Sequence, residues 1–173
     1  MEAMEKGVAE DIDIATPKGV IKSRIGGIID RIDSKEGTLR IVDYKTGGSP
    51  KTPTDVASLF IPSEARPNYI FQTFLYAAIM QRKQPLKVAP ALLYIHRAAS
   101  EDYSPVIEMG EARKEKIPVD DFSVFEEEFR ESLDSCSVKY LIRRNLYKQK
   151  WQETVSIVIS RHCAKNRKKN LWI

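Results

Sequence analysis

Three ionisable residues on two predicted strands have the types and the spacing of a hydrolytic site. Asp43 and Lys45 lie two residues apart in the segment 38–47, so on a strand both side chains point to one face, about 7 Å apart at the backbone. Asp30 lies in the segment 20–33, which we expect to pair with 38–47. If this pairing places Asp30 beside Asp43, the two carboxylates resist joint ionisation unless a cation lies between them. Mg²⁺ suits such a place because it prefers hard oxygen ligands, and Lys45 would then orient a water or stabilise charge on a phosphate.

Two polar residues are expected to face the same place from a helix. The segment 67–83, PNYIFQTFLYAAIMQRK, has apolar residues at three- and four-residue spacing, and Pro67 suits the first turn of a helix. Gln72 and Tyr76 lie at positions i and i+4, and therefore on one side of that helix. Because the rest of the helix is apolar, we expect this polar side to face the carboxylates.

The remaining elements must hold these residues in position. We predict a hairpin over 20–45, in which Gly26 and Gly27 mark a bulge or a close approach of the backbone. The other predictions are a turn at 34–37, a loop at 47–55, a buried strand at 88–96, an edge strand at 102–110 and a helix at 122–133. Residues 1–17 are polar and show no clear apolar period. This order of elements predicts an α/β or α+β domain.

The motifs resemble those of a known family. GGIIDRID, IVDYKTG and QTFLY match, in this order, the patterns GxxD, (D/E)xK and QxxxY. Over about residues 20–96 the chain resembles the PD-(D/E)xK nuclease superfamily, and within it the RecB/AddB-like branch, the C-terminal nuclease domain of helicase–nucleases. The resemblance implies a restriction-endonuclease-like α/β core, with a mixed β-sheet flanked by α-helices.

The resemblance also implies roles for individual residues. The implied catalytic set is Asp30, Asp43, Lys45, Gln72 and Tyr76. Asp30, Asp43 and the backbone carbonyl of Tyr44 would bind Mg²⁺ or Mn²⁺, Lys45 would be the catalytic lysine, and the two helix residues would contact the DNA strand. The implied reaction is metal-dependent hydrolysis of phosphodiester bonds in DNA, in repair or recombination, with a helicase region or a partner subunit.

Two departures from the family pattern bear on this implication. The family has an upstream helix with a histidine, whereas about twenty residues precede the GxxD strand here, and His96 and His162 lie far downstream. We therefore expect the chain to be truncated at its N-terminus, as the C-terminal end of a longer protein. Cys136 and Cys163 do not match the cysteine cluster that many members carry near the C-terminus, so an iron–sulfur cluster is not supported.

Simpler interpretations remain open for each residue. Asp30 and Asp43 would be ordinary solvated acids of a strand if taken one at a time. Lys45 would then be a surface lysine paired with Asp43, which contributes little when exposed. Gln72 and Tyr76 would be polar helix positions. At the level of the whole chain, the alternative is a catalytically inactive DNA-binding or scaffold module of a helicase–nuclease complex.

The last forty residues differ from the rest in charge. Residues 134–173 hold ten Lys and Arg against two acids, while the whole chain has a net charge of +4. We therefore expect a nuclease core over 1–133 and a basic, atypical tail over 134–173. Synonymous codons from Thr154 to Ala164 permit a shifted reading, CKYCDFKALC, with the family's type of cysteine cluster. Our hypothesis is that the tail is a frame-shifted read. The alternatives are an unstructured basic tail, which we favour of the two, and nonspecific DNA binding through phosphate contacts.

Length and composition limit the setting of this domain. The 173 residues suit one domain, and no apolar run approaches the ~18 residues of a membrane span. The acidic N-terminus lacks the cationic and apolar segments of a secretory signal, and two cysteines cannot form a disulfide framework. We therefore expect no membrane partner and a cytoplasmic location.

Overall fold

The computed structural model describes residues 3–17, 19–62, 67–143 and 155–156. The strands are β1 (Ala3–Thr16), β2 (Gly19–Lys35), β3 (Thr38–Lys45), β4 (Lys87–Tyr94), β5 (Glu108–Met109), β6 (Ile117–Pro118) and β7 (Val155–Ser156). The helices are α1 (Asn68–Gln81) and α2 (Ser123–Arg143), with short 3-10 helices at Ala57–Phe60 and Ile95–Arg97.

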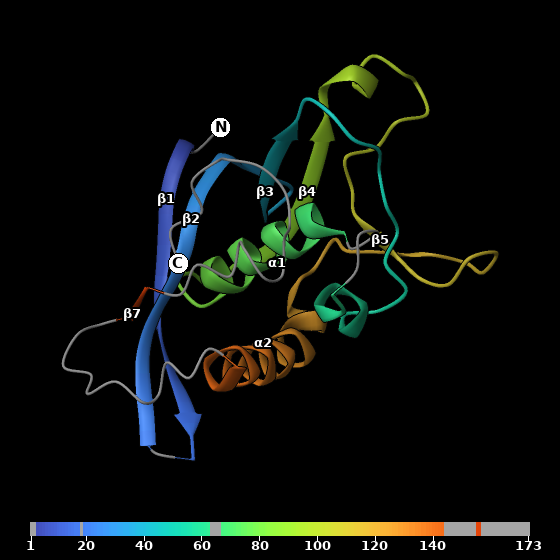
Figure 1. The fold of residues 1–173 in the computed structure, drawn as a ribbon. Helices are drawn as coiled ribbons and strands as arrows, with labels where there is room; N and C mark the ends of the chain where they lie inside the picture. The colour runs from blue at the N-terminus through green and yellow to red at the C-terminus, as the bar shows by residue number, and fades with distance from the viewer. Residues whose placement is uncertain (1–2, 18, 63–66, 144–154, 157–173) are drawn as a thin grey trace.

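The main sheet is mixed and has the order β1-β2-β3-β4 (Figure 1). β1 with β2 and β2 with β3 are antiparallel, whereas β3 and β4 are parallel, with α1 in the connection between them. β7 pairs with β2 in parallel at Ser23 and Arg24. The parallel pair brings the C-terminal ends of β3 and β4 together, which places the loops after Lys45 and Tyr94 at the same edge of the sheet.

β1 corrects the prediction for the N-terminal segment. Residues 1–17 showed no clear period, yet β1 pairs with β2 along nearly its whole length, from Ala3 with Ile32 to Thr16 with Gly19. β1 lies at the edge of the sheet order, and many of its side chains are exposed. Val8 and Ile14 are its buried apolar residues. An edge strand needs few apolar residues, so its sequence carries a weak pattern.

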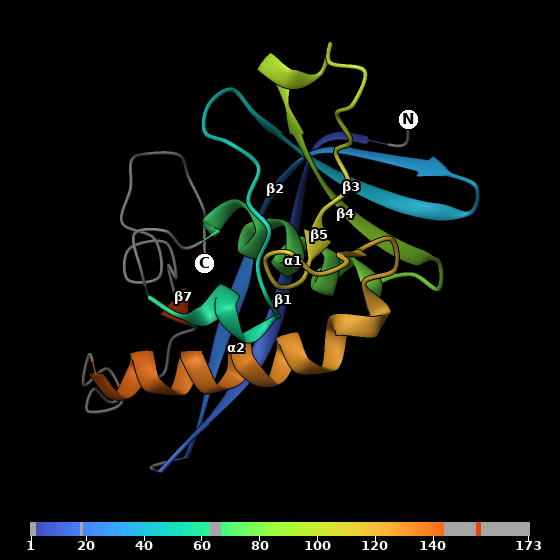
Figure 2. The ribbon, with the colours of Figure 1, turned by 90° about the vertical axis from the view of Figure 1, so that its right-hand side faces the viewer.

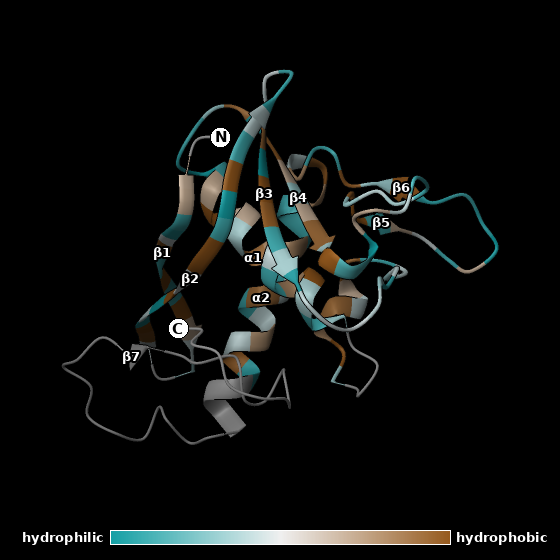
Figure 3. Cartoon of the chain, turned by 90° about the horizontal axis from the view of Figure 1, so that it is seen from above, coloured by the Kyte–Doolittle hydropathy of each residue, from teal (hydrophilic) through white to brown (hydrophobic). Residues whose placement is uncertain are grey.

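The core lies between the sheet and the two helices (Figure 2). α1 is buried from Ile70 to Met80 except at Gln72, and α2 packs against α1 and β1. Four phenylalanines bring α1 and α2 together: Phe74 lies 5.4 Å from Phe122 and 5.9 Å from Phe129, and Phe71 lies 5.8 Å from Phe129, between ring centroids. The hydropathy colouring shows apolar segments along β2, β3, β4 and α1 (Figure 3). Phe122 and Phe129, at and after the start of α2, are therefore part of the core.

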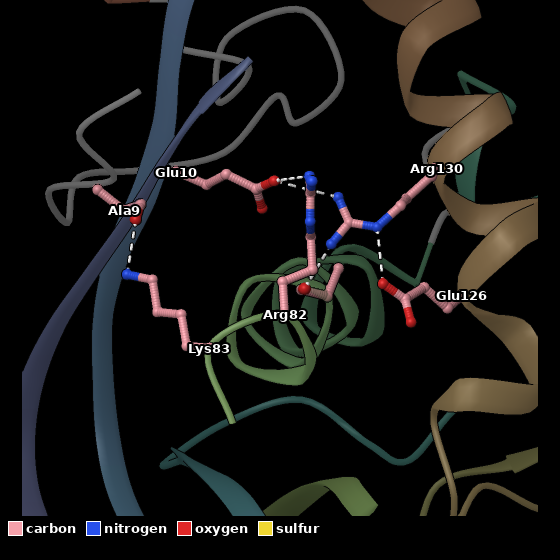
Figure 4. A network of polar contacts seen from close by, with 7 residues as sticks. Ala9, Glu10, Arg82, Lys83, Glu126 and Arg130 are labelled. Carbon is pink, nitrogen blue, oxygen red and sulfur yellow. Dashed lines mark hydrogen bonds and ion pairs between the residues drawn. The ribbon is translucent and has the colours of Figure 1, made fainter. Parts of the chain in front are cut away.

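An ion-pair network joins α2 to β1 and α1 (Figure 4). Arg130 donates to the Ala78 carbonyl at 2.6 Å, to Glu126 Oε1 at 2.8 Å and to Glu10 Oε1 at 3.4 Å. Arg82 also pairs with Glu10. The Ala78 carbonyl belongs to the last turn of α1, where a cation is favourable. The network thus fixes α1, which carries two predicted site residues, against two other elements.

The segment after β4 differs from the predicted edge strand at 102–110. It forms one isolated antiparallel bridge, between Ala91 and Val106, while Glu108–Met109 pairs with β6 instead. Tyr103 lies against β4: its hydroxyl donates to the Leu92 carbonyl at 2.6 Å and accepts from the Tyr94 N–H at 2.8 Å. Pro105 cannot donate to a ladder, and its carbonyl accepts from the Leu92 N–H. Side-chain and irregular contacts therefore replace a regular strand here.

α2 runs past the end of the predicted helix at residue 133. It continues to Arg143, across position 134, where the composition changes. Most of the predicted tail, residues 144–154 and 157–173, lies outside the described residues, as does Cys163. In the part of the chain that the structure describes, no helix is both long and apolar enough to cross a membrane.

Candidate active site

Asp43 is a buried carboxylate on β3. The residue is 2% exposed, and β3 lies between β2 and β4 in the sheet. Burial raises the pKa of Asp43 to about 6; the charge and hydrogen bond of Lys45 lower it in part, and the charge of Asp30 adds to the increase. The Oδ2 atom is paired with Lys45 and has no other hydrogen-bond donor among the described residues. The charge of Asp43 is therefore only partly compensated.

Asp30 reaches the same place through the register of β2 with β3, because the ladder pairs Arg31 with Val42 and its continuation sets Asp30 opposite Asp43. Its neighbours Ile29 and Arg31 both pair with β1, whereas Asp30 lies outside that ladder. Its carboxylate accepts a hydrogen bond from the backbone N–H of Tyr44 at 2.8 Å, which fixes it next to the C-terminal end of β3. The structure thus brings Asp30 and Asp43 together, and the effect of Asp30 on the pKa of Asp43 follows from this proximity.

Lys45 lies on the same side of β3 as Asp43. The two side chains form an ion pair, and the Lys45 side chain is only 13% exposed. A lysine in a partly desolvated place interacts more strongly with a neighbouring charge than one in water. Lys45 is the cation nearest to Asp43 that contributes to its pKa, and it does not offset the burial of that carboxylate.

Gln72 and Tyr76 face the carboxylates from α1, as their spacing predicted. Gln72 Nε2 donates to the Tyr76 hydroxyl at 3.0 Å. Burial raises the pKa of Tyr76 to about 12, the hydrogen bond from Gln72 lowers it, and the charges of Asp43 and Asp30 raise it. Tyr76 therefore keeps its proton at neutral pH and has it available to donate.

Gly27 makes room for Tyr76. A Cβ atom at position 27 would lie 2.4 Å from the Tyr76 hydroxyl oxygen, closer than real contacts allow. A Cβ atom at Gly26 would lie 2.1 Å from the Val8 carbonyl oxygen of β1. The predicted close approach is therefore confirmed for both glycines. Gly27 lies against Tyr76 of α1, and Gly26 lies against the backbone of β1.

Two further tyrosines adjoin the site, and the sequence analysis did not include them. Tyr69 contacts Lys45, whose Nζ lies 4.4 Å from the centre of the ring. Tyr94, at the end of β4, is 3% exposed, and burial raises its pKa to about 12, with further increases from Tyr103, Tyr69 and Asp43. Tyr69 lies three residues before Gln72. Extending the polar side of α1 by one turn toward the N-terminus would therefore have predicted that Tyr69 lies near the site.

The opposite face of the hairpin carries a separate cluster. Asp33 accepts two hydrogen bonds from Arg40, at 2.6 and 2.9 Å, and pairs with Arg31. Burial alone would raise the pKa of Asp33, but the hydrogen bonds and charges of Arg40 and Arg31 outweigh it and lower the pKa. Arg31 follows Asp30 directly, yet it belongs to this cluster and not to the candidate site.

A family comparison agrees with this arrangement. The model of the PD-(D/E)XK nuclease superfamily matches residues 2–164, nearly the whole chain. The chain belongs to this superfamily. Comparisons with curated proteins and with solved structures gave no match. The mixed sheet flanked by helices is consistent with the restriction-endonuclease-like fold of PD-(D/E)XK nucleases, so the predicted fold class is confirmed.

PD-(D/E)XK nucleases generally use divalent metals such as Mg²⁺ or Mn²⁺, and the residues present here fit such an ion. Asp43 offers a buried carboxylate oxygen that has no hydrogen-bond donor among the described residues other than Lys45, and Asp30 is a second carboxylate beside it. Mg²⁺ is commonly bound by one or two carboxylates together with waters and a substrate phosphate. The described residues contain no group of three or more His, Cys, Asp and Glu that would hold a metal without such help.

An apolar hollow lies elsewhere and does not include these residues. It is lined by Val56, Met109, Ile117 and Phe125 among others, beneath the 54–56 loop. None of the five predicted site residues lines it. Its lining is mainly apolar, with two carboxylates, Asp55 and Glu128, and it lies apart from the cluster around Asp43.

Proposed function

We propose that the chain is a metal-dependent deoxyribonuclease that hydrolyses phosphodiester bonds in DNA. One observation carries the proposal: Asp43 is buried with incomplete charge compensation, between a second carboxylate and a lysine. A purely structural carboxylate at this depth would be expected to have its oxygens fully hydrogen-bonded. Membership of a nuclease superfamily supports the same activity.

We propose that Asp30, Asp43 and the backbone carbonyl of Tyr44 hold Mg²⁺ or Mn²⁺. When bound, such an ion supplies Lewis-acid polarisation of the phosphate and makes a bound water more acidic. The affinity should fall at low pH, because the carboxylates must be deprotonated to bind the ion.

The other site residues act on the phosphate and the water. The Lys45 ammonium would hold the attacking water and stabilise the negative charge that develops on the phosphate oxygens. Tyr76 would donate a hydrogen bond to a carboxylate or to a phosphate oxygen, with its orientation fixed by Gln72. Attack of the water forms the new P–O bond while the bond to the leaving nucleotide oxygen breaks.

We also propose the finer assignment to the RecB/AddB-like branch, with a role in repair or recombination beside a helicase region or partner subunit, in the cytoplasm. The order of GxxD, DxK and QxxxY in this chain supports it. Co-purification of the tagged chain, followed by an ATP-dependent DNA-unwinding assay on the eluate, would test the partner. Absence of any helicase activity in the eluate would contradict this assignment.

Two measurements test the proposed function. Calorimetry with Mn²⁺ should show saturable binding to the wild type, loss of binding in Asp43→Ala, and unchanged binding in Asp13→Ala, which removes an exposed carboxylate from β1. Cleavage of linear DNA should then require the metal and Lys45. No binding at millimolar metal, or cleavage that persists in Asp43→Ala, would contradict the proposal.

A second candidate is a noncatalytic DNA-binding or scaffold module. One observation favours it: two carboxylates are a small ligand set, and the described residues supply no third nearby. Under this alternative, Lys45→Ala would leave DNA binding unchanged and the wild type would not cleave DNA with any divalent metal. Cleavage by the wild type that Lys45→Ala loses would exclude it.

A further inference from the structure

Tyr69 is an exposed aromatic residue in contact with the proposed catalytic lysine. Lys45 Nζ lies 4.4 Å from the centre of its ring, within the range of a cation–π contact. Tyr69 is 42% exposed, which is unusual on a helix whose next turns are buried. Its packing therefore contributes little to the core, and its contact with Lys45 is the specific interaction of its ring.

The backbone around Tyr69 holds the ring in this place. Tyr69 lies in the first turn of α1, and its carbonyl accepts a hydrogen bond from Thr73 Oγ1 at 2.6 Å. Gly48, in the loop that follows β3, has a φ of +83°, and a Cβ atom there would lie 3.5 Å from Tyr69 Cε2 and 4.0 Å from Tyr94 Cε1. The loop after Lys45 therefore passes close to the same ring.

Lys45 thus has two neighbours of different kinds. On one side is the carboxylate of Asp43, and on the other is the face of the Tyr69 ring. A lysine side chain has four rotatable carbon bonds and loses much rotamer freedom when it is held in one position. A carboxylate that is shared with a divalent cation holds a lysine less strongly than a free one, whereas a ring face is unaffected by that cation's coordination.

We propose that Tyr69 is a positioning residue for Lys45, and that its ring face, not its hydroxyl, does this. The proposal rests on the proposed function, since it assigns Lys45 a place in the cleavage reaction. The ring contact should therefore exist in the free protein, and its loss should lower the rate of the chemical step.

The first test concerns catalysis and uses Tyr69→Leu beside Tyr69→Phe. Tyr69→Leu should lower kcat for linear DNA about tenfold with little change in KM. The free energy of a cation–π contact in a partly desolvated place corresponds to a change in rate of about this factor. Tyr69→Phe keeps the ring face and should stay within about twofold of the wild type. Unchanged kcat in Tyr69→Leu, an equal loss in Tyr69→Phe, or a change confined to KM would each overturn the proposal.

The second test does not depend on cleavage. In a ¹H–¹³C spectrum of the free protein with labelled lysine, the Cε protons of Lys45, assigned by their disappearance in Lys45→Arg, should lie upfield because of the ring current of Tyr69. Tyr69→Leu should move them to the position of the other lysines, and Tyr69→Phe should not. A Lys45 signal at the common position in the wild type would overturn the ring contact, even if the wild type cleaves DNA. An inactive wild type would contradict the proposed function, and with it the role assigned to Lys45, even where the ring contact is observed.

Discussion

Asp33 and Asp43 lie on two strands of one hairpin and are both nearly inaccessible to solvent, but Asp43 lies deeper in the protein and their electrostatic outcomes are opposite. Their side chains are 4% and 3% exposed. Asp33 is held by two arginines that more than offset its burial, so its pKa is lowered. Asp43 has one lysine and a second carboxylate nearby, so burial dominates and its pKa rises to about 6. The same residue type is therefore stabilised as an anion on one face and destabilised on the other.

The difference separates a carboxylate whose charge is compensated from the one that we propose to be functional. Three hydrogen bonds from guanidinium groups reach Asp33, and the two from Arg40 join β3 to β2. Asp43 Oδ2 has an ion pair with Lys45 but no other hydrogen-bond donor among the described residues. A buried carboxylate whose charge is only partly compensated lowers the stability of the fold and remains able to bind a cation. Substitutions on the two faces of the hairpin test this contrast.

Removing Lys45 should have the largest effect, and on activity. Lys45→Ala should lower kcat for DNA cleavage about 10²- to 10³-fold, as loss of one stabilising group at a developing charge does. Steady-state cleavage of linear DNA measures this, with Lys35→Ala, an exposed lysine of the same hairpin, as the control. If both variants keep wild-type rates, the site face of the hairpin has no catalytic role.

Neutralising Asp33 should cause a large loss of stability. Asp33→Asn leaves Arg31 and Arg40 without their anion and should lower the free energy of unfolding by about 2 kcal/mol, a value reduced because both arginines are about one third exposed. Chemical denaturation at pH 7.5 measures it. Because the pKa of Asp33 is lowered in the folded state, its contribution is present above its unfolded pKa and is lost as the pH falls further. A variant as stable as the wild type would show that this cluster is not structural.

Filling the space at Gly27 should have an intermediate effect. Gly27→Ala places a methyl group 2.4 Å from the Tyr76 hydroxyl oxygen, so Tyr76 must move, at a cost of about 1–3 kcal/mol. Gly7→Ala is a matched control on the neighbouring strand, since nothing lies within 4 Å of its added carbon. Thermal unfolding of both variants gives the comparison. Equal melting temperatures would contradict the close contact between β2 and α1.

Neutralising Asp43 should change stability in the opposite direction. Between its unfolded pKa near 3.8 and its folded pKa of about 6, the folded state holds the proton more tightly, so the wild type loses stability as the pH rises through this range. Asp43→Asn should therefore be more stable than the wild type at pH 7.5 with EDTA, by up to about 3 kcal/mol for this difference between the two pKa values, and equally stable near pH 4. Thermal unfolding at both pH values tests this. A variant destabilised as much as Asp33→Asn would break the contrast between the two acids.

Periodic and motif-bearing segments could be predicted from the sequence. The hairpin at 20–45, the helix at 67–83 and the strand at 88–96 correspond to β2–β3, α1 and β4. Their patterns are strong because the three strands and the helix bury apolar residues against the core. The spacing of Gln72 and Tyr76 predicted their shared side of α1, and the superfamily motif predicted which acids lie together.

Elements that depend on pairing or on single side chains could not be predicted. β1 has few buried apolar residues, and it is held by its ladder with β2. The position of Asp30 opposite Asp43 depends on the register between β2 and β3, which alternation alone does not fix. The segment 102–110 contacts β4 mainly through one hydroxyl, which leaves no periodic pattern.

The contact of Tyr103 with β4 also affects how molecules of this protein meet each other. A bare edge strand offers free N–H and C=O groups to any extended segment, and edge-to-edge pairing is a common start of aggregation. At β4 the outward groups of Leu92 and the N–H of Tyr94 are taken by Tyr103 and Pro105. A second molecule therefore finds no open ladder at this point of the sheet, close to where the DNA substrate would have to approach.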